Sequence, residues 1–570
     1  MIQKIIHLSK RHSLVLFLLG GAIILRLIFM LNNWPATDSE EGTMGLEALH
    51  ILQKGEHPIY FYGQYYMGVA EAYIGAVMFK LFGISIFSLR LGMLLLFLIF
   101  LILVYLLGSL LYNKKVALWT LALLAGGSEI LLTPELKAVG GAAETLVCGT
   151  ALQVLTSWII LRTIRGQATK KNYQGYAYGC WGFIAGFGLW SHLLVVPFIL
   201  TSGTFLFLFC RKTLKKGTGW LMLIGFLIGA SPLIIFNILT PQHNTIAVFW
   251  GLHQTTYPNA PTGITLWAKQ IIGTFFYTLP LATGMLRFSD LQVVPGLSQF
   301  IHINELNALP LYGPLNWQSL IPIVFFGGWS TGFLALLFSS TKHSFTRTYL
   351  FWKKSRNNVN LSKEERLQFT LHALQCMLLL NGWLTIISFV TSATAAERPW
   401  SFRYLIGLLI ITPALVAPLC QSRPSLQKRP VWKYIGIRTL ITLALGIICL
   451  STLQNFFELP QATTAFQNQT LFVHQLEQKH ITHIYSGYWV CDRLIFASQE
   501  NVICAVLNNN MQPGLTRYSQ YQTIVRKDPQ AAYVFTTNTD FDPQQAINTL
   551  KQNRDYQQFS TDGYIVFYPK

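Results

Sequence analysis

Three carboxylates lie close together in the stretch Asp38-Ser39-Glu40-Glu41, a few residues after the first long apolar segment. That segment, residues 14–31, is long enough to cross a bilayer, and several Lys and Arg residues precede it. Because positive charge is retained in the cytoplasm, we expect the three carboxylates to emerge together at the outer membrane face. Clustered carboxylates raise one another's pKa, which favours a general base or a cation site.

Further ionisable side chains are expected at the same face, on loops that are far apart in the chain. Lys137 and Glu144 lie in the loop before one predicted span, and His192 lies in a turn between two others. Arg403 and Tyr404 precede a late span. Ionisable groups at membrane depth are costly, so they are often functional. Together they predict a polar cavity that opens outward.

Each of these residues also has a structural explanation. Asp38 suits an N-cap, and Glu41 suits the positive end of a helix dipole. Glu144 suits the solvated start of a span, His192 a hydrogen-bonded turn, and Arg403 an arginine that reaches lipid headgroups. The sequence alone leaves these alternatives open.

An aromatic cluster follows in the first outer loop, and it includes Tyr62, Gln64 and Tyr65. Aromatic faces can stack on sugar rings or border an acyl chain. The same residues also suit an aromatic belt at the membrane interface.

The composition is that of a polytopic membrane protein. The chain is 52% hydrophobic and only 11% charged, which is too apolar for an ordinary soluble protein. Its formal net charge of +19 comes from Lys and Arg in alternate connections between spans, which is the positive-inside pattern and not a groove for nucleic acid. We therefore expect a multi-pass protein of the plasma (inner) membrane, with a cytoplasmic N-terminus and the lipid bilayer as its surroundings.

The predicted fold is an all-α membrane domain over residues 1–454, followed by a small extracytoplasmic α/β domain over residues 455–570. Eleven spans are predicted, at residues 14–31, 88–110, 116–133, 141–161, 177–190, 193–209, 218–239, 320–340, 370–391, 404–420 and 434–453. The first outer loop, residues 32–87, is expected to hold an amphipathic helix at 43–54 and an interfacial helix at 69–82. A second outer segment, 240–318, contains an apolar piece at 267–286 that we expect to be interfacial or re-entrant.

Alternating strand-like and helix-like runs predict the C-terminal domain. Strands are expected at 483–485, 502–507, 532–536 and 563–568, and helices at 471–479 and 543–553. Cys491 and Cys504 lie in this domain, where a disulfide could form, although the sequence does not give their separation.

The first outer loop resembles that of the GT-C glycosyltransferases. An acidic pair opens a helix, and the run His57-Pro58-Ile59-Tyr60-Phe61-Tyr62-Gly63-Gln64 follows, then Phe82-Gly83 and Ser88-Leu89-Arg90-Leu91. The pattern is similar to the branch of protein mannosyltransferases and lipid A aminoarabinose transferases (glycosyltransferase family 39), which use polyprenyl-phosphate sugars at the outer membrane face. With Gly45 as the anchor, the family's Asp-Glu pair falls on Glu40-Glu41, and Asp38 is an additional acid that could take the Asp role.

Two shorter patterns are also similar to that family, namely Lys137…Gly141…Glu144 and Arg403-Tyr404. The family's Lys-Pro after the aromatic cluster is replaced here by Met67-Gly68-Val69. The resemblance therefore implies that Lys137, Arg90 or Arg403 contacts the phosphate of the donor.

These observations predict an inverting glycosyltransferase that moves one sugar from a polyprenyl-phosphate carrier to an extracytoplasmic acceptor, in cell-envelope glycan, glycolipid or protein glycosylation. The base candidates are Asp38, Glu40 and Glu41, and Glu144 would assist or help to hold a divalent cation, the one candidate cofactor. The residues expected to bind substrate are Arg90, Lys137, His192, Arg403, Tyr404, Tyr62, Gln64 and Tyr65. A transporter or lipid-linked-sugar flippase is the alternative, and a non-catalytic scaffold is a third hypothesis.

Overall fold

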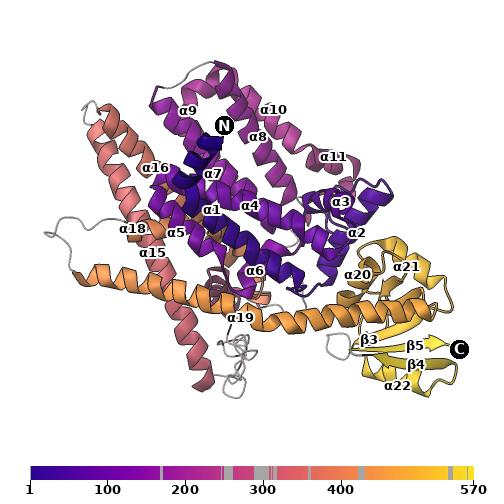
Figure 1. The fold of residues 1–570 in the computed structure, drawn as a ribbon. Coiled ribbons are helices and arrows are strands. Elements are labelled where there is room, and N and C mark those ends of the chain that lie inside the picture. The colour runs from indigo at the N-terminus through magenta and orange to yellow at the C-terminus, as the bar shows by residue number, and fades with distance from the viewer. Residues whose placement is uncertain are drawn as a thin grey trace. The chain divides into compact units, whose positions relative to one another are not determined.

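The fold is taken from a computed structural model of the chain (Figure 1). It describes residues 2–166, 171–245, 247–248, 261–287, 307, 309, 311, 313, 317–356, 361–420, 431–536, 543–561 and 563–570. Much of the predicted outer segment 240–318 and the basic connection at 421–430 lie outside the described residues.

The chain divides into two compact units, each described here by itself. The first comprises Met1–Leu25, Leu95–Glu135 and Gly141–Phe457, and the second comprises Arg26–Leu94, Leu136–Gly140 and Glu458–Lys570. Four helices belong partly to each unit, namely α1 (Ile2–Leu31), α4 (Ile86–Leu111), α19 (Val431–Gln478) and α6 (Glu129–Leu136), of which only the last residue, Leu136, lies in the second unit. The second unit therefore combines the first outer loop with the C-terminal residues. The domain boundary predicted between residues 454 and 455 stays a prediction.

The first unit is helical. Its other elements are α5 (Lys114–Ala125), α7 (Ala142–Ile164), α8 (Lys171–Ser191), η1 (Leu193–Val195), α9 (Val196–Thr213), η2 (Leu214–Thr218), α10 (Gly219–Gly229), α11 (Ser231–Leu239), η3 (Pro241–His243), α13 (Gly263–Gly273), η4 (Thr274–Thr278), α14 (Leu279–Ala282), α15 (Trp317–Arg356), α16 (Lys363–Val390), α17 (Ala393–Glu397), η6 (Phe402–Ile411) and α18 (Thr412–Cys420). Its apolar core is built mainly from Leu, Ile and Phe side chains of α4, α7, α9, α16 and η6.

The described helices account for some of the eleven predicted spans. Among the described residues, seven helices are long and apolar enough to cross a membrane, or nine if two sharply bent pairs are each one span. These pairs are α5 with α6, bent by 90°, and α10 with α11, bent by 56°. All eleven predicted spans fall in helices. However, α8, which contains the predicted span 177–190, is not among the seven, and the apolar helix Phe402–Pro418, at the predicted span 404–420, is too short to be counted with them. The count of eleven is therefore not confirmed.

Glycines bring α8 and α10 into close contact. A Cβ atom at Gly182 or Gly186 of α8 would overlap the α10 backbone, and one at Gly225 or Gly229 of α10 would overlap the α8 backbone. Small residues at such spacing let two membrane helices approach until their backbones touch, which increases van der Waals contact where no hydrophobic driving force acts between helices.

The first outer loop forms α2 (Ser39–Gln53) and α3 (Ala70–Phe82). The predicted helix at 43–54 begins four residues earlier, because Asp38 caps it at Ser39. The expected amphipathic character is wrong, because the helix is buried on nearly all sides, including the polar residues Thr43 and Glu47. The helix predicted at 69–82 is confirmed as α3, and its interfacial position stays a prediction.

The C-terminal residues form a five-stranded sheet in the order β2-β1-β3-β5-β4. The strands are β1 (His483–Ser486), β2 (Ile503–Val506), β3 (Ala532–Thr536), β4 (Tyr556–Thr561) and β5 (Tyr564–Pro569), and the helices are α20 (Tyr488–Ala497), α21 (Ser519–Arg526) and α22 (Gln544–Gln552). Strands β1, β2 and β3 are parallel, with Ile484 beside Cys504 and Ala532, whereas β5 is antiparallel to both β3 and β4. The four predicted strands are confirmed. The predicted helix at 471–479 is the last part of α19, while β4, α20 and α21 were not predicted.

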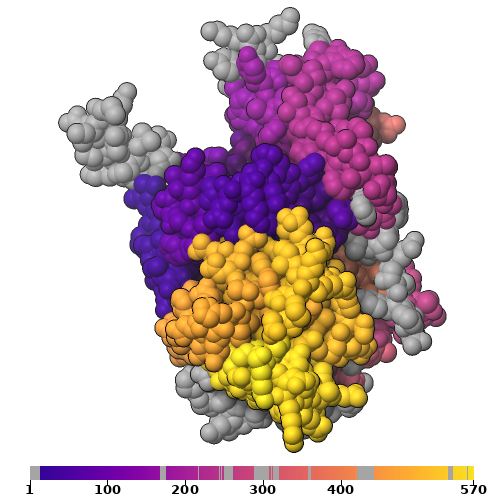
Figure 2. Space-filling model, turned by 90° about the vertical axis from the view of Figure 1, so that its right-hand side faces the viewer, coloured from indigo at the N-terminus to yellow at the C-terminus, as the bar shows by residue number. Residues whose placement is uncertain are grey.

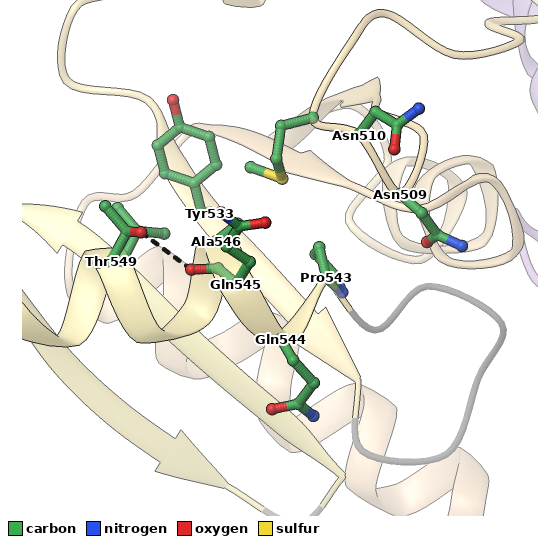
Figure 3. A pocket seen from close by; sticks show the side chains of 10 residues that line it. Asn509, Asn510, Tyr533, Pro543, Gln544, Gln545, Ala546 and Thr549 are labelled. Atoms are coloured by element: carbon green, nitrogen blue, oxygen red, sulfur yellow. Dashed lines mark hydrogen bonds between the residues drawn. The ribbon is translucent and has the colours of Figure 1, made fainter.

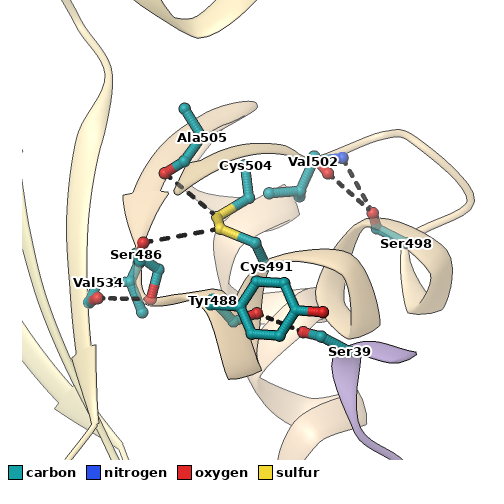
Figure 4. The surroundings of a disulfide bond; sticks show 9 residues. All are labelled: Ser39, Ser486, Tyr488, Cys491, Ser498, Val502, Cys504, Ala505 and Val534. Atoms are coloured by element: carbon teal, nitrogen blue, oxygen red, sulfur yellow. Dashed lines mark hydrogen bonds between the residues drawn. A yellow bond between two sulfur atoms is a disulfide. The ribbon is translucent and has the colours of Figure 1, made fainter. Parts of the chain in front are cut away.

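A disulfide joins Cys491 of α20 to Cys504 of β2, with the two Cα atoms 5.2 Å apart (Figure 4). On its other side, α20 packs against α2 of the first outer loop. Figure 2 shows these two parts of the second unit, in indigo and in orange to yellow, lying directly against each other. The contact is close because α2 has glycine where α20 crosses it. A Cβ atom at Gly42 would lie 2.6 Å from the backbone nitrogen of Arg493.

The substitution Gly42→Ala is expected to lower stability. The added methyl group meets backbone atoms, which cannot move aside as a flexible side chain can, so we expect an overpacking cost of about 1–3 kcal/mol. The thermal unfolding of the purified chain in detergent measures this. Gly446→Ala is the matched control, because nothing lies within 4 Å of a Cβ atom there and Ala favours a helix over Gly. Equal melting temperatures for the two variants would contradict the tight contact.

Candidate functional site

The three predicted acids lie at the start of α2, and each has a different position. Asp38 is the N-cap, and its Oδ1 accepts a hydrogen bond of 3.0 Å from the backbone N–H of Glu41. Glu40 and Glu41 follow in the first turn, near the positive end of the helix dipole. The structural explanations given for Asp38 and Glu41 are thus confirmed: Asp38 caps the helix, and Glu41 lies near the positive end of its dipole.

Glu41 forms a buried ion pair with Arg90 of α4. Arg90 donates from Nε to Oε1 and from Nη2 to Oε2, each at 2.7 Å, and Nη2 also reaches the carbonyl of Pro35 at 2.7 Å. The exposed fractions of the two side chains are 1% for Arg90 and 0% for Glu41. This bidentate pair holds the planar guanidinium and carboxylate groups in a fixed geometry. Neither side chain therefore has its charge available to a ligand.

Asp38 pairs with Lys137 instead. The Lys137 Nζ lies 2.5 Å from Asp38 Oδ2 and 2.8 Å from the carbonyl of Ala36. The Asp38 side chain is 35% exposed, whereas that of Lys137 is 6% exposed. Burial alone would raise the pKa of Asp38, but the Lys137 charge and the Glu41 N–H outweigh it and hold the pKa below its usual value. The expectation that clustered acids raise one another's pKa is wrong for Asp38, because its near neighbour is a cation.

Glu71 is a buried acid that the sequence analysis did not assign to the site. It lies in the first turn of α3, is 1% exposed, and accepts a 2.9 Å hydrogen bond from the backbone N–H of Gly140. Gly140 has φ +82, a conformation that side chains disfavour, and the Met67 side chain lies where its Cβ would be. An acid inside an otherwise apolar helix was the available signal.

Helix α20 holds α2 through polar contacts as well. Ser39 Oγ donates to the Tyr488 carbonyl at 2.5 Å (Figure 4), and Thr43 Oγ1 lies 2.6 Å from Asp492 Oδ2 and 2.7 Å from the Ser39 carbonyl. A threonine hydroxyl has one hydrogen to donate. Thr43 therefore satisfies both oxygens only when Asp492 is protonated and itself donates. Burial raises the pKa of Asp492 to about 6, against the opposing effects of Thr43 and Arg517.

The aromatic cluster forms a tight turn, closed by the bridge between Tyr60 and Gly68. The Tyr62 hydroxyl donates to Glu56 Oε2 at 2.6 Å and lies 2.8 Å from His50 Nδ1.

Gln64 lies against the guanidinium of Arg517, and with its amide oxygen facing that group it accepts from Nη1 and Nη2 at 2.8 Å. Tyr65 is half-buried. The side chains of Tyr62 and Gln64 are thus engaged within the second unit, where they connect the turn to neighbouring residues.

Four predicted site residues belong to the first unit, and the structure brings them together there. Glu144 Oε2 accepts from the backbone N–H of Gly141 at 3.1 Å at the start of α7, and the His192 ring lies against Gly141. The rings of His192 and Tyr404 are 6.4 Å apart, and the Arg403 guanidinium lies 5.5 Å from the Tyr404 ring. Burial, assisted by the Arg403 charge, lowers the pKa of His192 to about 4, so this histidine is neutral at pH 7.

The predicted site residues thus form two groups. The first unit contains Glu144, His192, Arg403 and Tyr404, and the second contains Asp38, Glu40, Glu41, Arg90, Lys137, Tyr62, Gln64 and Tyr65. Within the described part of the chain, no group of three or more His, Cys, Asp or Glu residues is placed to hold a metal ion.

The chain matches one family model over part of its length and is similar to solved structures of membrane glycosyltransferases. Residues 68–236 match the family model of dolichyl-phosphate-mannose-protein mannosyltransferases, whereas no curated protein matches the sequence. The chain is similar to the structure of ArnT from Cupriavidus metallidurans bound to undecaprenyl phosphate, with a TM-score of 0.57 and 12% identity over 98% of each chain. The archaeal oligosaccharyltransferase AglB from Archaeoglobus fulgidus, in complex with an inhibitory peptide and a dolichol-phosphate, gives a TM-score of 0.48 and 12% identity over 99% of this chain and 75% of that one.

The substitution Asp492→Asn is expected to stabilise the protein above about pH 6. An unfolded aspartate has a pKa near 3.8, so the folded state binds more protons than the unfolded state between that value and about 6. The wild type therefore loses stability as the pH rises through this window, by up to about 3 kcal/mol. The introduced asparagine carries no charge and can donate to Thr43. The melting temperatures of both proteins between pH 4 and 8 measure the difference, which should vanish at the acidic end.

Asp528→Asn provides the opposite control. Its hydrogen bond with His483 lowers the pKa of Asp528, so removing this charge should not stabilise the protein at pH 8. A gain for both variants, or a gain for Asp492→Asn that is independent of pH, would contradict the role given to the buried carboxyl.

Proposed function

We propose that this chain, a membrane protein with the fold of the GT-C glycosyltransferases, transfers one sugar from a polyprenyl-phosphate donor to an extracytoplasmic acceptor with inversion at the anomeric carbon. The family match at residues 68–236 and the undecaprenyl phosphate bound to ArnT support this donor class. The observation that carries the proposal is the partly exposed Asp38 at the start of α2, paired with Lys137.

Asp38 is the proposed base. Of the two acids whose partners are described, Glu41 is committed to Arg90, whereas Asp38 is reachable from solvent and keeps its charge at neutral pH. The carboxylate takes the proton from an acceptor hydroxyl or amine while that atom attacks the anomeric carbon. The bond from this carbon to the phosphate oxygen breaks, and the polyprenyl phosphate leaves with the electron pair. Glu40, which is also partly exposed, is the second base candidate.

Lys137 is the proposed contact for the donor phosphate in the second unit, and Arg403 of the first unit stays a candidate phosphate contact by itself. Arg90 is less suited to this role because two of its nitrogens already bind Glu41 and Pro35. An arginine offers two parallel hydrogen bonds to a phosphate, and a lysine offers a point charge. A phosphate leaving group needs no strong acid, so a base and a cation beside it suffice. A divalent cation held with the help of Glu144 stays a proposal.

We also propose that the C-terminal residues lie outside the cytoplasm of a cell whose plasma membrane holds the spans. The Cys491–Cys504 disulfide supports this orientation, because disulfides persist in oxidising compartments and are rare in the cytosol. The positive-inside distribution of Lys and Arg supports it as well.

A transporter or flippase of lipid-linked sugars is the second candidate. The bends of 90° and 56° within two apolar helix pairs favour it, since transporters build substrate sites at broken helices. Reconstitution in vesicles with a labelled polyprenyl-phosphate sugar separates the two functions. Sugar transfer without movement of the lipid across the bilayer supports the enzyme, and movement without transfer supports the transporter.

Asp38→Asn is expected to abolish transfer while the fold is retained. Asparagine caps a helix about as well as aspartate, but it cannot accept a proton, so we expect the transfer rate to fall by about 10²-fold or more. The assay follows sugar transfer from a polyprenyl-phosphate donor by purified protein, with the melting temperature as the measure of folding. Glu365→Gln is the matched control, because Glu365 at the start of α16 pairs with a lysine, Lys354, as Asp38 at the start of α2 pairs with Lys137. Full activity in Asp38→Asn, in Glu40→Gln and in the double variant would disprove the assignment of either acid as the base.

Lys137→Met is expected to change the pH dependence of the same reaction. The Lys137 charge lowers the pKa of Asp38, so its removal raises that pKa and leaves less ionised base at low pH. The acidic limb of kcat/KM should move upward by about one pH unit or more, and Lys137→Arg should restore it. A loss of equal size at every pH would restrict Lys137 to phosphate binding and disprove its coupling to the base.

A further inference from the structure

The second unit contains an open hollow of about 610 Å³ that the proposed chemistry does not use (Figure 3). Its wall comes from three segments, namely the loop at 509–511, Tyr533 of β3, and α22 with the residue before it. Ligand sites in proteins commonly have volumes of this order.

Among its described residues, the lining combines polar and apolar side chains and has no charged one. None of the ten described residues around the hollow is Asp, Glu, Lys, Arg or His, and six offer an amide or a hydroxyl group: Asn509, Asn510, Tyr533, Gln544, Gln545 and Thr549. Each amide both donates and accepts hydrogen bonds. The hydroxyl groups around a sugar ring do the same, whereas a phosphate or carboxylate ligand would call for Arg or Lys, and a hard cation for carboxylates.

One aromatic side chain, that of Tyr533, is among the described residues that line the hollow. Tyr533 stacks on Tyr485 of β1, with centroids 5.3 Å apart and an angle of 22°, and lies 6.1 Å from the Tyr556 ring of β4. The Met511 and Leu550 side chains add apolar surface. The C–H faces of a pyranose ring suit such a surface, while its edge hydroxyls meet the amides.

The loop that presents the amides is held in one conformation. Asn508 Oδ1 accepts from the backbone N–H groups of Asn510 and Gln512, each at 3.0 Å, and Asn508 N–H donates to the Gln512 carbonyl at 2.9 Å. Met511 has φ +57, an uncommon value for a residue with a side chain. A loop fixed in this way loses little conformational freedom when a ligand binds, which favours affinity.

We infer that this hollow binds a neutral oligosaccharide. Binding itself does not depend on the proposed transfer reaction. We further identify this glycan as the sugar acceptor, or as part of it, and this step rests on the proposed function. The acceptor of the proposed reaction at the start of α2 would then be a neutral oligosaccharide.

The test uses the full chain in detergent, fluorescently labelled, on an array of neutral, uronate-bearing and phosphorylated oligosaccharides. We expect retention on neutral members, and a Kd for the strongest of them that rises about tenfold or more in the double variant Asn510→Ala/Gln545→Ala, because two hydrogen-bonding amides are removed. Both side chains are exposed, so the fold should be kept.

The control is Asn548→Ala/Gln552→Ala, which removes two exposed amides of the same helix that do not line the hollow. Its Kd should equal that of the wild type. Absence of binding to every neutral glycan, retention of charged glycans only, or equal Kd values for the two double variants would each overturn the inference.

Asp38→Asn separates this inference from the proposed function. We expect this variant to keep glycan binding when transfer is lost. Glycan binding by a wild-type protein that transfers no sugar would leave the hollow assigned and the proposed function rejected.

Discussion

The buried ion pair between Glu41 and Arg90 fixes the start of α2, and the candidate site depends on it. Both side chains are withdrawn from water and joined by two hydrogen bonds of 2.7 Å. Removing one member of such a pair leaves the other charge buried without a partner, which lowers the free energy of unfolding by about 3–5 kcal/mol. Helix α2 therefore cannot turn or slide along α4 without a large penalty. Asp38 lies three residues before Glu41, so this constraint fixes its position as well. The Asp38 carboxylate then lies 2.5 Å from the Nζ atom of Lys137.

The opposite side of α2 is fixed by α20, and the result is that the pKa values of Asp38 and Asp492 are shifted in opposite directions. Asp38, next to a cation and partly exposed, has a lowered pKa. Asp492, buried beside Thr43, has a pKa raised to about 6. Pairs of acids whose environments push their pKa values apart are what acid–base chemistry needs. In this unit the separation comes from burial and from the position of one lysine, not from repulsion among the acids.

The sequence could predict what is local or periodic. Apolar runs located the helices, and the acid at Asp38 before the first turn of α2 carried the signature of an N-cap. It could not predict the partners of Ser39 and Thr43, because these lie 449 residues away. Strand β4 was missed because four of its six residues are polar, so no apolar alternation marks it. The pKa direction of Asp38 was wrong for the same reason as the missed contacts: the deciding charge, Lys137, comes from a distant loop.

The distribution of charge within the second unit fits the two tasks proposed for it. Acids and bases are concentrated around α2, where a carboxylate and a lysine are placed to handle a proton and a phosphate. The described lining of the hollow beside α22 has no charged side chain and includes four amides and a tyrosine, which suits a ligand with hydroxyl groups. A positively charged hollow would attract the phosphate of the donor as well as an acceptor, and the two would compete. Because the described lining of the hollow has no cationic side chain, we expect it to bind a lipid phosphate weakly. The donor and the acceptor are then distinguished by their charge before any sugar is recognised.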